Sequence, residues 1–160
     1  MKLQREADAQ VKRQVEEELA RLQRLSEEER CVERACRHIV DRILTLRCPN
    51  PNGCDAAFLD FEGCFDLQCS ACRTHFCGWC LQFCGADAHP HVRQCAKRLS
   101  ADIYFGSVEE FERSNRERRR AQLVQYLGTL QARERQRSVV TALRVQLRDL
   151  GLQDVLARFQ

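Results

Sequence analysis

Residues 69–80 read Cys-Ser-Ala-Cys-Arg-Thr-His-Phe-Cys-Gly-Trp-Cys, which is two C-x2-C pairs separated by four residues. Each C-x2-C turn can present two thiolates about 3.5 to 4 Å apart, and a tetrahedral zinc ion takes its ligands from two such turns. Cys48 and Cys54 precede this stretch, and a group of histidines with Cys95 follows it. The repetition predicts a small domain that is organised by two zinc ions.

Composition favours metal over disulfides as the source of stability in this segment. Nine of the 11 cysteines fall between residues 48 and 95, and a segment of about 50 residues rarely buries enough apolar surface to fold unaided. The chain opens on a charged helical stretch and has no apolar run long enough to span a bilayer. We therefore expect no membrane association and a reducing compartment, cytoplasmic or nuclear, in which thiols bind metal instead of pairing as disulfides.

The order of the ligands predicts how they are shared between the two ions. Sequential use gives a first site of Cys48, Cys54, Cys69 and Cys72, and a second site of Cys77, Cys80, one histidine and Cys95. Pro90 can open a helix, which would place His91 and Cys95 one turn apart with both side chains aimed the same way. His91 is the predicted ligand, and His89 and Cys84 are the alternatives.

Helical periodicity on both sides of the cysteine-rich segment predicts an α+β protein that is mainly α, with three parts. Residues 1–47 form a charged helical arm, residues 48–97 the two-zinc hairpin and loop domain, and residues 98–160 a helical segment that starts at a capping box, Ser107 to Glu110. We expect one long helix from there to Gly151, with only a short turn after it.

The arm carries one narrow apolar stripe of Ala7, Val11, Val15 and Leu19, with Leu22 and Leu25 beyond. Such a thin stripe on a charged helix is typical of a coiled-coil seam or of docking on a partner helix. Ser26 to Glu29 has the pattern of a second capping box, which predicts a kink or restart near residue 26.

Within the cysteine-rich segment, the apolar residues at 58–61 and 65–68 flank Glu62-Gly63-Cys64. This arrangement predicts a short hairpin whose tight turn carries Cys64.

The charge pattern gives little reason to expect nucleic acid as a partner. The formal net charge is +3, and the arginines of residues 116–120 are balanced by nearby glutamates. The part of the C-terminal helix that contains these arginines has almost no apolar residues, so we expect it to bridge solvent.

Cys64 is the cysteine that the zinc assignment leaves over in the pattern Gly-Cys-x4-Cys-x2-Cys-x4-Cys-x2-Cys of residues 63–80, with Phe76 and Trp79 around the last pair. This pattern resembles the in-between-RING and Rcat zinc domains of RING-between-RING ubiquitin ligases, over about residues 44 to 97. In the Rcat domain, the cysteine after a glycine accepts ubiquitin as a thioester and passes it to a lysine. The resemblance implies that Cys64 is that acceptor and that ubiquitin and a ubiquitin-conjugating enzyme are partners.

Two positions depart from the family pattern. The family commonly has a histidine two residues after the nucleophile and an acidic residue two before the fifth zinc cysteine, whereas this chain has Asp66 and His75 there. A histidine oriented by a carboxylate can activate a thiol, so Cys64, His75 and Asp66 are the candidate catalytic trio.

Because the family's reaction starts at a separate RING domain, we expect the chain to belong to a larger ligase. The alternative is a non-catalytic, zinc-stabilised interaction module with coiled-coil-like arms.

Overall fold

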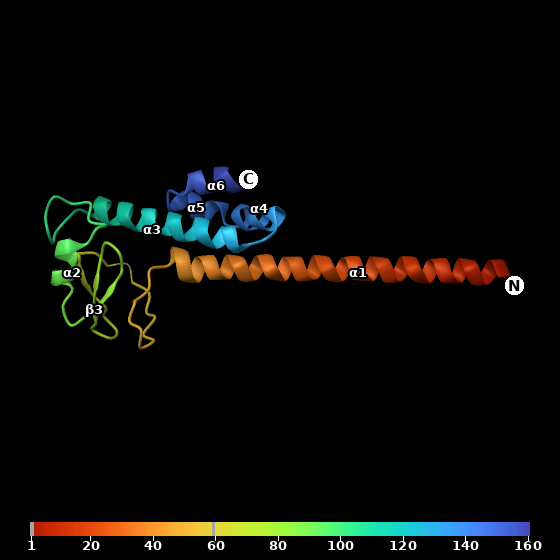
Figure 1. Cartoon of the computed structure of the whole chain (residues 1–160), viewed down its shortest axis with the longest axis horizontal. Helices are drawn as coiled ribbons and strands as arrows, with labels where there is room; N and C mark the ends of the chain where they lie inside the picture. The colour runs from red at the N-terminus through yellow and green to blue at the C-terminus, as the bar shows by residue number, and fades with distance from the viewer. Residues whose placement is uncertain (1, 59) are drawn as a thin grey trace.

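The computed structural model describes residues 2–58 and 60–160. It is an α+β structure, mainly helical, with one small antiparallel sheet. Its elements are α1 (Lys2–His38), the π-helix η1 (Ile39–Leu44), β1 (Asp66–Gln68), β2 (His75–Cys77), β3 (Phe83–Gly85), α2 (His89–Gln94), α3 (Val108–Thr129), α4 (Arg133–Ala142), α5 (Arg144–Asp149) and α6 (Gln153–Phe159). Figure 1 shows the sheet and α2 at one end, α3 running from there toward the middle with α4 to α6 next to it, and α1 projecting to the other end. None of the described helices is long and apolar enough to cross a membrane.

The helix α1 runs unbroken through Ser26, so the kink expected near residue 26 is absent (Figure 1). The side chain of Arg30 reaches back to Ser26, with Nε 3.2 Å from its carbonyl oxygen and Nη2 3.3 Å from its hydroxyl. Residues 2–47 contain neither glycine nor proline, and the strong helix formers around Ser26 continue the helix through it. A capping-box pattern marks a helix start only where the preceding chain leaves the helix.

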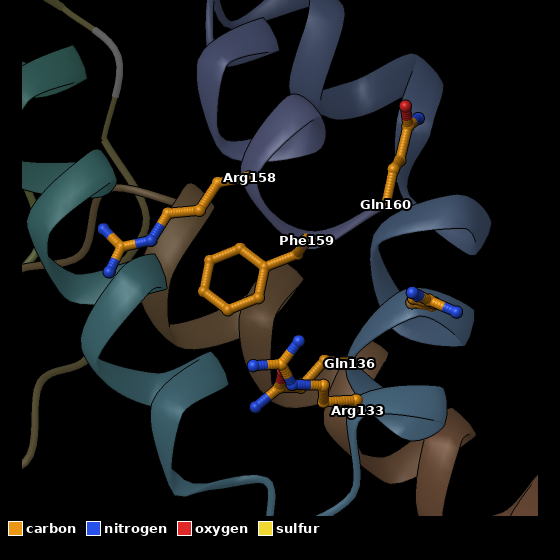
Figure 2. A pocket seen from close by; sticks show the side chains of 6 residues that line it. Arg133, Gln136, Arg158, Phe159 and Gln160 are labelled. Atoms are coloured by element: carbon orange, nitrogen blue, oxygen red, sulfur yellow. The ribbon is translucent and has the colours of Figure 1, made fainter.

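A helical core forms where the end of α1 and η1 meet α3 to α6. Its buried residues are Ala35, Ile39, Ile43, Leu44, Leu123, Leu127, Val139, Val140, Leu143, Leu147, Leu152, Val155 and Leu156. A pocket of about 220 Å³ lies between α4 and α6, lined by Arg133, Gln136, Arg137, Arg158, Phe159 and Gln160 (Figure 2). It belongs to this helical part of the molecule and contains no predicted site residue.

The C-terminal segment is four helices, and the prediction of one long helix to Gly151 is wrong. After α3 ends at Thr129, the Gln136 side-chain amide donates to the carbonyl oxygens of Leu127 and Leu130, each at 2.9 Å. These bonds satisfy carbonyls that the end of a helix leaves free. The turn allows Val139 and Val140 to pack against Leu127 in the helical core, which a straight helix would have left exposed.

A second core lies under the sheet and is built largely from aromatic rings. The strand order is β1-β2-β3, with Leu67 opposite Phe76. The rings of Phe65 and Trp79 stack at a centroid distance of 3.4 Å and an interplanar angle of 6°. This core, which we call the metal core, also includes Phe111 of α3.

The hairpin predicted around Cys64 is wrong for the described residues, because β1 pairs with β2 and with none of residues 58, 60 and 61. Leu59, which was part of the prediction, lies outside the described residues. Phe58 and Phe61 instead pack their rings on Phe76 and Phe111, at centroid distances of 4.9 and 4.4 Å. Cys64 forms an isolated antiparallel bridge to Phe105, from the loop that leads into α3. Ring packing therefore positions Phe61, while an antiparallel bridge between Arg47 and Ala57 also holds the chain before it.

The helix α3 joins the two cores through the stretch that was expected to bridge solvent, and that expectation is wrong. Ser114 and Asn115 are buried, and Arg118 and Arg119 are half-buried. The Ser114 hydroxyl donates to the carbonyl oxygen of Trp79 at 2.9 Å. Arg119 Nε donates to the carbonyl oxygen of Leu44 at 2.9 Å. Ser114 and Arg119 thus bond carbonyl oxygens of neighbouring segments, whereas Arg118 donates to the Asn115 side chain within α3 at 2.8 Å.

Candidate metal centres and the Cys64 region

The two C-x2-C pairs adopt the same backbone turn. The backbone N–H groups of Arg73 and Leu81, which follow the two pairs, donate to the carbonyl oxygens of Cys69 and Cys77, each at 2.8 Å. Arg73 and Leu81 have positive φ angles of 63° and 60°. A tight turn with one left-handed residue brings the two thiols of each pair to the same side of the chain.

The first cluster consists of Cys48, Cys54, Cys69 and Cys72, the four residues predicted for the first site. The Sγ atoms of Cys48 and Cys72 are 3.6 Å apart, and those of Cys54 and Cys69 are 3.7 Å apart. A Zn–S bond of about 2.3 Å in tetrahedral geometry gives a sulfur–sulfur separation of about 3.8 Å. The observed separations fit a four-thiolate site to within about 0.2 Å.

The second cluster consists of Cys77, Cys80, His91 and Cys95. Pro90 lies in the first turn of α2, and Cys95 caps the helix, as the sequence predicted. His91 Nε2 lies 3.2 Å from the Sγ of Cys80. Both alternatives for the fourth ligand lie elsewhere: Cys84 donates to the Gln82 carbonyl oxygen at 3.2 Å, and His89 faces two carboxylates. The two clusters could each hold one metal ion.

Contacts around the thiols shift their pKa values in opposite directions. Hydrogen bonds from Asn50 and Thr74 lower the pKa of Cys72 to about 5, with Nδ2 of Asn50 at 3.4 Å and Oγ1 of Thr74 at 3.0 Å from its sulfur. A hydrogen bond from Cys77 lowers the pKa of Cys80 to about 5. Burial raises the pKa of Cys48 to about 12. Each cluster thus contains one thiol that ionises readily at neutral pH.

The structure brings Asp66 and His75 together, the two positions where this chain departs from the family pattern. His75 Nδ1 lies 2.7 Å from Asp66 Oδ1, and the Asp66 side chain is only 5% exposed. The other oxygen of Asp66 lies 2.9 Å from His89 Nδ1, which also lies 2.7 Å from Asp87 Oδ1. Asp66 is thus hydrogen-bonded to His75 and faces His89, whose Nδ1 is hydrogen-bonded to Asp87.

Cys64 does not complete this arrangement by direct contact. It is half-buried, directly after Gly63, whose φ of 95° turns the chain toward β1. Among the described residues, no hydrogen bond joins its thiol to His75 or Asp66. The second ring nitrogen of His75 lies 3.1 Å from Gln68 Nε2, so both nitrogens of His75 have other partners.

Sequence patterns did not indicate Asn50, Thr74 or Gln68 beside these sites, and they indicated His89 only as an alternative zinc ligand. Asn50, Thr74, Gln68 and His89 contact a predicted ligand or a predicted catalytic residue. The only local signal was the Asp87-Ala88-His89 spacing, which lets the Asp87 carboxylate accept from the backbone N–H of His89 at 3.0 Å. The others come from loops or strands whose register the sequence did not reveal.

Comparison of the chain with family models, with curated proteins and with solved structures gives no match.

Proposed function

We propose that this chain is a two-zinc module of the in-between-RING/Rcat type that acts in ubiquitin transfer, with Cys64 as the ubiquitin acceptor. The resemblance of residues 63–80 suggested this function, and the grouping of eight residues into two sequential clusters supports the zinc part of it. Zinc is the metal that best suits tetrahedral sites of four thiolates, or of three thiolates and one imidazole. A reducing compartment would keep these thiols available to it.

The observation that carries the catalytic part is the 2.7 Å contact between His75 and the buried carboxylate of Asp66. A buried carboxylate that accepts from Nδ1 fixes the ring and stabilises its protonated form, which makes the other nitrogen a better base. A carboxylate and an imidazole are thus in contact here, although Asp66 and His75 each stand at the position where the family pattern has the other residue type.

In the proposed reaction, the Cys64 thiolate attacks the thioester carbonyl of a loaded conjugating enzyme. The bond to that enzyme's cysteine breaks, and its sulfur leaves and takes up a proton. An acceptor lysine amine then attacks the new thioester, gives a proton to Nε2 of His75, and displaces Cys64 as a thiolate. His75 must release its contact with Gln68 for this second step, because the same nitrogen faces the Gln68 amide at 3.1 Å.

The test is an adduct experiment. A conjugating enzyme loaded with ubiquitin is mixed with the zinc-loaded chain and a separately supplied RING domain, and a reducible chain–ubiquitin adduct is expected. Cys64→Ala should abolish the adduct, whereas Cys84→Ala should retain it. Cys84 is the matched control because it is also half-buried and lies outside both metal clusters. If no adduct forms with two equivalents of zinc bound, the catalytic proposal fails.

Two observations favour a second candidate function, a non-catalytic interaction module. Both nitrogens of His75 are occupied, and the exposed apolar residues of α1 offer a surface for a partner helix. In this case the metal core is a rigid platform and the adduct experiment gives no product, while the two zinc ions remain bound.

A further inference from the structure

A third group of possible metal ligands lies outside both cysteine clusters. It consists of Asp66 in β1, Asp87 in the loop before α2, and His89 at the start of α2. One ligand atom from each residue lies within 4.8 Å of those from the other two. Two carboxylates and an imidazole are thus brought together from two separate parts of the chain.

The two carboxylates of this group have no lysine or arginine as a partner. Among the described residues, their ion-pair contacts are with His75 and His89 only. The Asp66 side chain is 5% exposed, and a carboxylate buried without a compensating cation is costly. When both imidazoles are neutral, the group carries two negative charges, which favours a divalent cation.

The ring nitrogen between the two carboxylates cannot donate a proton to both of them. His89 Nδ1 lies 2.7 Å from Asp87 Oδ1 and 2.9 Å from Asp66 Oδ2, and its hydrogen bond is to Asp87. An imidazole nitrogen carries at most one proton. Among the described residues, no other group donates to Asp66 Oδ2. A metal ion in place of the Nδ1 proton would be a partner for all three atoms.

The separations of the three atoms select a coordination geometry. With metal–ligand bonds of about 2.0 to 2.2 Å, ligands at right angles lie about 2.8 to 3.1 Å apart, and tetrahedral ligands about 3.3 to 3.6 Å apart. The separations of 2.7 and 2.9 Å from His89 Nδ1 match the octahedral case to within about 0.1 Å. Hydrogen-bond spacing is compatible with a shared ion, since His91 and Cys80 of the second cluster also lie 3.2 Å apart.

We propose that Asp66, Asp87 and His89 form a third metal site, which binds one divalent ion that accepts octahedral coordination and oxygen ligands, such as Mn²⁺. Asp66 Oδ2, Asp87 Oδ1 and His89 Nδ1 occupy one face of the octahedron, and water occupies the other three positions. Asp66 Oδ1 keeps its hydrogen bond with His75. The site shares Asp66 with the proposed catalytic pair, but it does not rest on ubiquitin transfer, because its test measures metal binding alone.

The first test is a titration of the zinc-loaded full chain with Mn²⁺, in which electron paramagnetic resonance reports the free ion. Mn²⁺ binds weakly to thiolates in comparison with zinc, so it leaves the two cysteine clusters intact. We expect one Mn²⁺ per chain in addition to the two zinc ions. Asp87→Asn should raise the Mn²⁺ dissociation constant at least tenfold. Asp60→Asn makes the same change at an exposed residue outside the group, and should change that constant less than twofold.

Both variants should keep two equivalents of zinc, because the Asp87 side chain is 57% exposed and neither residue belongs to a cysteine cluster. Two outcomes would overturn the proposal. One is the absence of saturable Mn²⁺ binding up to about 1 mM, the weak end of the range for protein sites that bind divalent cations. The other is an equal effect of the two substitutions.

The second test locates the ion by nuclear magnetic resonance, because Mn²⁺ broadens the proton signals of groups close to it. The ring signals of His89 and His75 should broaden at the lowest Mn²⁺ concentrations. Those of His38, which stacks on Tyr126 beside the helical core, should stay sharp. The same titration with Mg²⁺, which is diamagnetic, should broaden none of them. Equal broadening of all histidines, or broadening that persists in Asp87→Asn, contradicts the site.

Discussion

Arg135 of α4 donates two hydrogen bonds to Glu28 of α1, one to each carboxylate oxygen, and both are 2.6 Å long. The two side chains are 28% and 44% exposed. The pair lies where α1 leaves the helical core, between the exposed apolar residues of α1 and the residues that pack on α4. It therefore joins α1 to α4 at this point.

We expect Glu28→Gln to lower the thermal stability of the helical core at neutral pH. The hydrogen bond from Arg135 holds the pKa of Glu28 below its ordinary value of 4.5. A lowered pKa stabilises the fold above pH 4.5, and this stabilisation is lost as the pH falls through the lowered value. The difference in melting temperature between the wild type and the variant should thus shrink on acidification. Glu27→Gln removes the same charge from an exposed neighbour and should have little effect at any pH. Equal melting temperatures at pH 7 would show that the pair contributes nothing.

Asn50→Ala should weaken metal retention at the first cluster. Asn50 donates to Cys72 Sγ and to Thr74 Oγ1, and outer-shell groups of this kind are worth about 10- to 100-fold in metal affinity. Loss of the bond raises the pKa of Cys72 from about 5, so protons displace the metal at a higher pH. A coloured chelator followed during acidification gives the release midpoint. Asn52→Ala, two residues away and exposed, is the control. An unchanged midpoint in Asn50→Ala would contradict the role given to Asn50.

Gly78→Ala should disrupt the second cluster. A Cβ at Gly78 would lie 2.9 Å from Phe65 Cδ1 and 3.3 Å from the Phe65 backbone. Gly78 also donates its N–H to the Phe65 carbonyl oxygen at 2.7 Å, so the turn between Cys77 and Cys80 has no room to move. We expect zinc content to fall from two equivalents to one, measured by elemental analysis. Gly128→Ala meets no atom within 4 Å and should retain both ions, with a gain in helix stability of up to about 1 kcal/mol. Two bound ions in Gly78→Ala would contradict the steric argument.

Leu127→Ala should destabilise the helical core by about 2 to 5 kcal/mol, the usual cost of a large cavity in a packed interior. Leu127 is fully buried, and the turn after α3 depends on its carbonyl oxygen as well as on its side chain. Chemical denaturation of the zinc-loaded chain gives the free energy of unfolding. Val145→Ala, at a position that is 59% exposed, should change it by less than about 0.5 kcal/mol. Similar losses in the two variants would argue against a packed helical core.

The predictable parts of this molecule are those that local spacing determines. A spacing of two residues between paired cysteines requires a tight backbone turn. The grouping of Cys69 with Cys72 and of Cys77 with Cys80 could therefore be predicted from the sequence. Pro90 lies in the first turn of α2, and His91, the residue after it, lies beside Cys80. The capping box at Ser107 is present because the chain before it is a loop.

The errors lie where a distant contact decides the structure. Ser26 has the same local pattern as Ser107, but the helix before it does not end. Gly128 is only a weak sign of a turn near Leu130, and the turn depends on Gln136 reaching back to the end of α3. Arg119 was expected to face solvent, because the sequence does not show that the end of η1 lies beside it in the structure. Local pattern cannot reveal such contacts, because the partner is many residues away or the same pattern occurs in two settings.

The bond from Arg119 to the Leu44 carbonyl oxygen has a consequence for metal affinity. It ties the chain just before the cysteine-rich segment to the helix that follows this segment, so the bond closes a loop of 75 residues from Leu44 to Arg119. Closing such a loop from a free chain costs about 3 to 4 kcal/mol in chain entropy. Because helix packing meets that cost before any ion binds, the helices that contribute no ligand would still affect the affinity of the thiols for a metal ion.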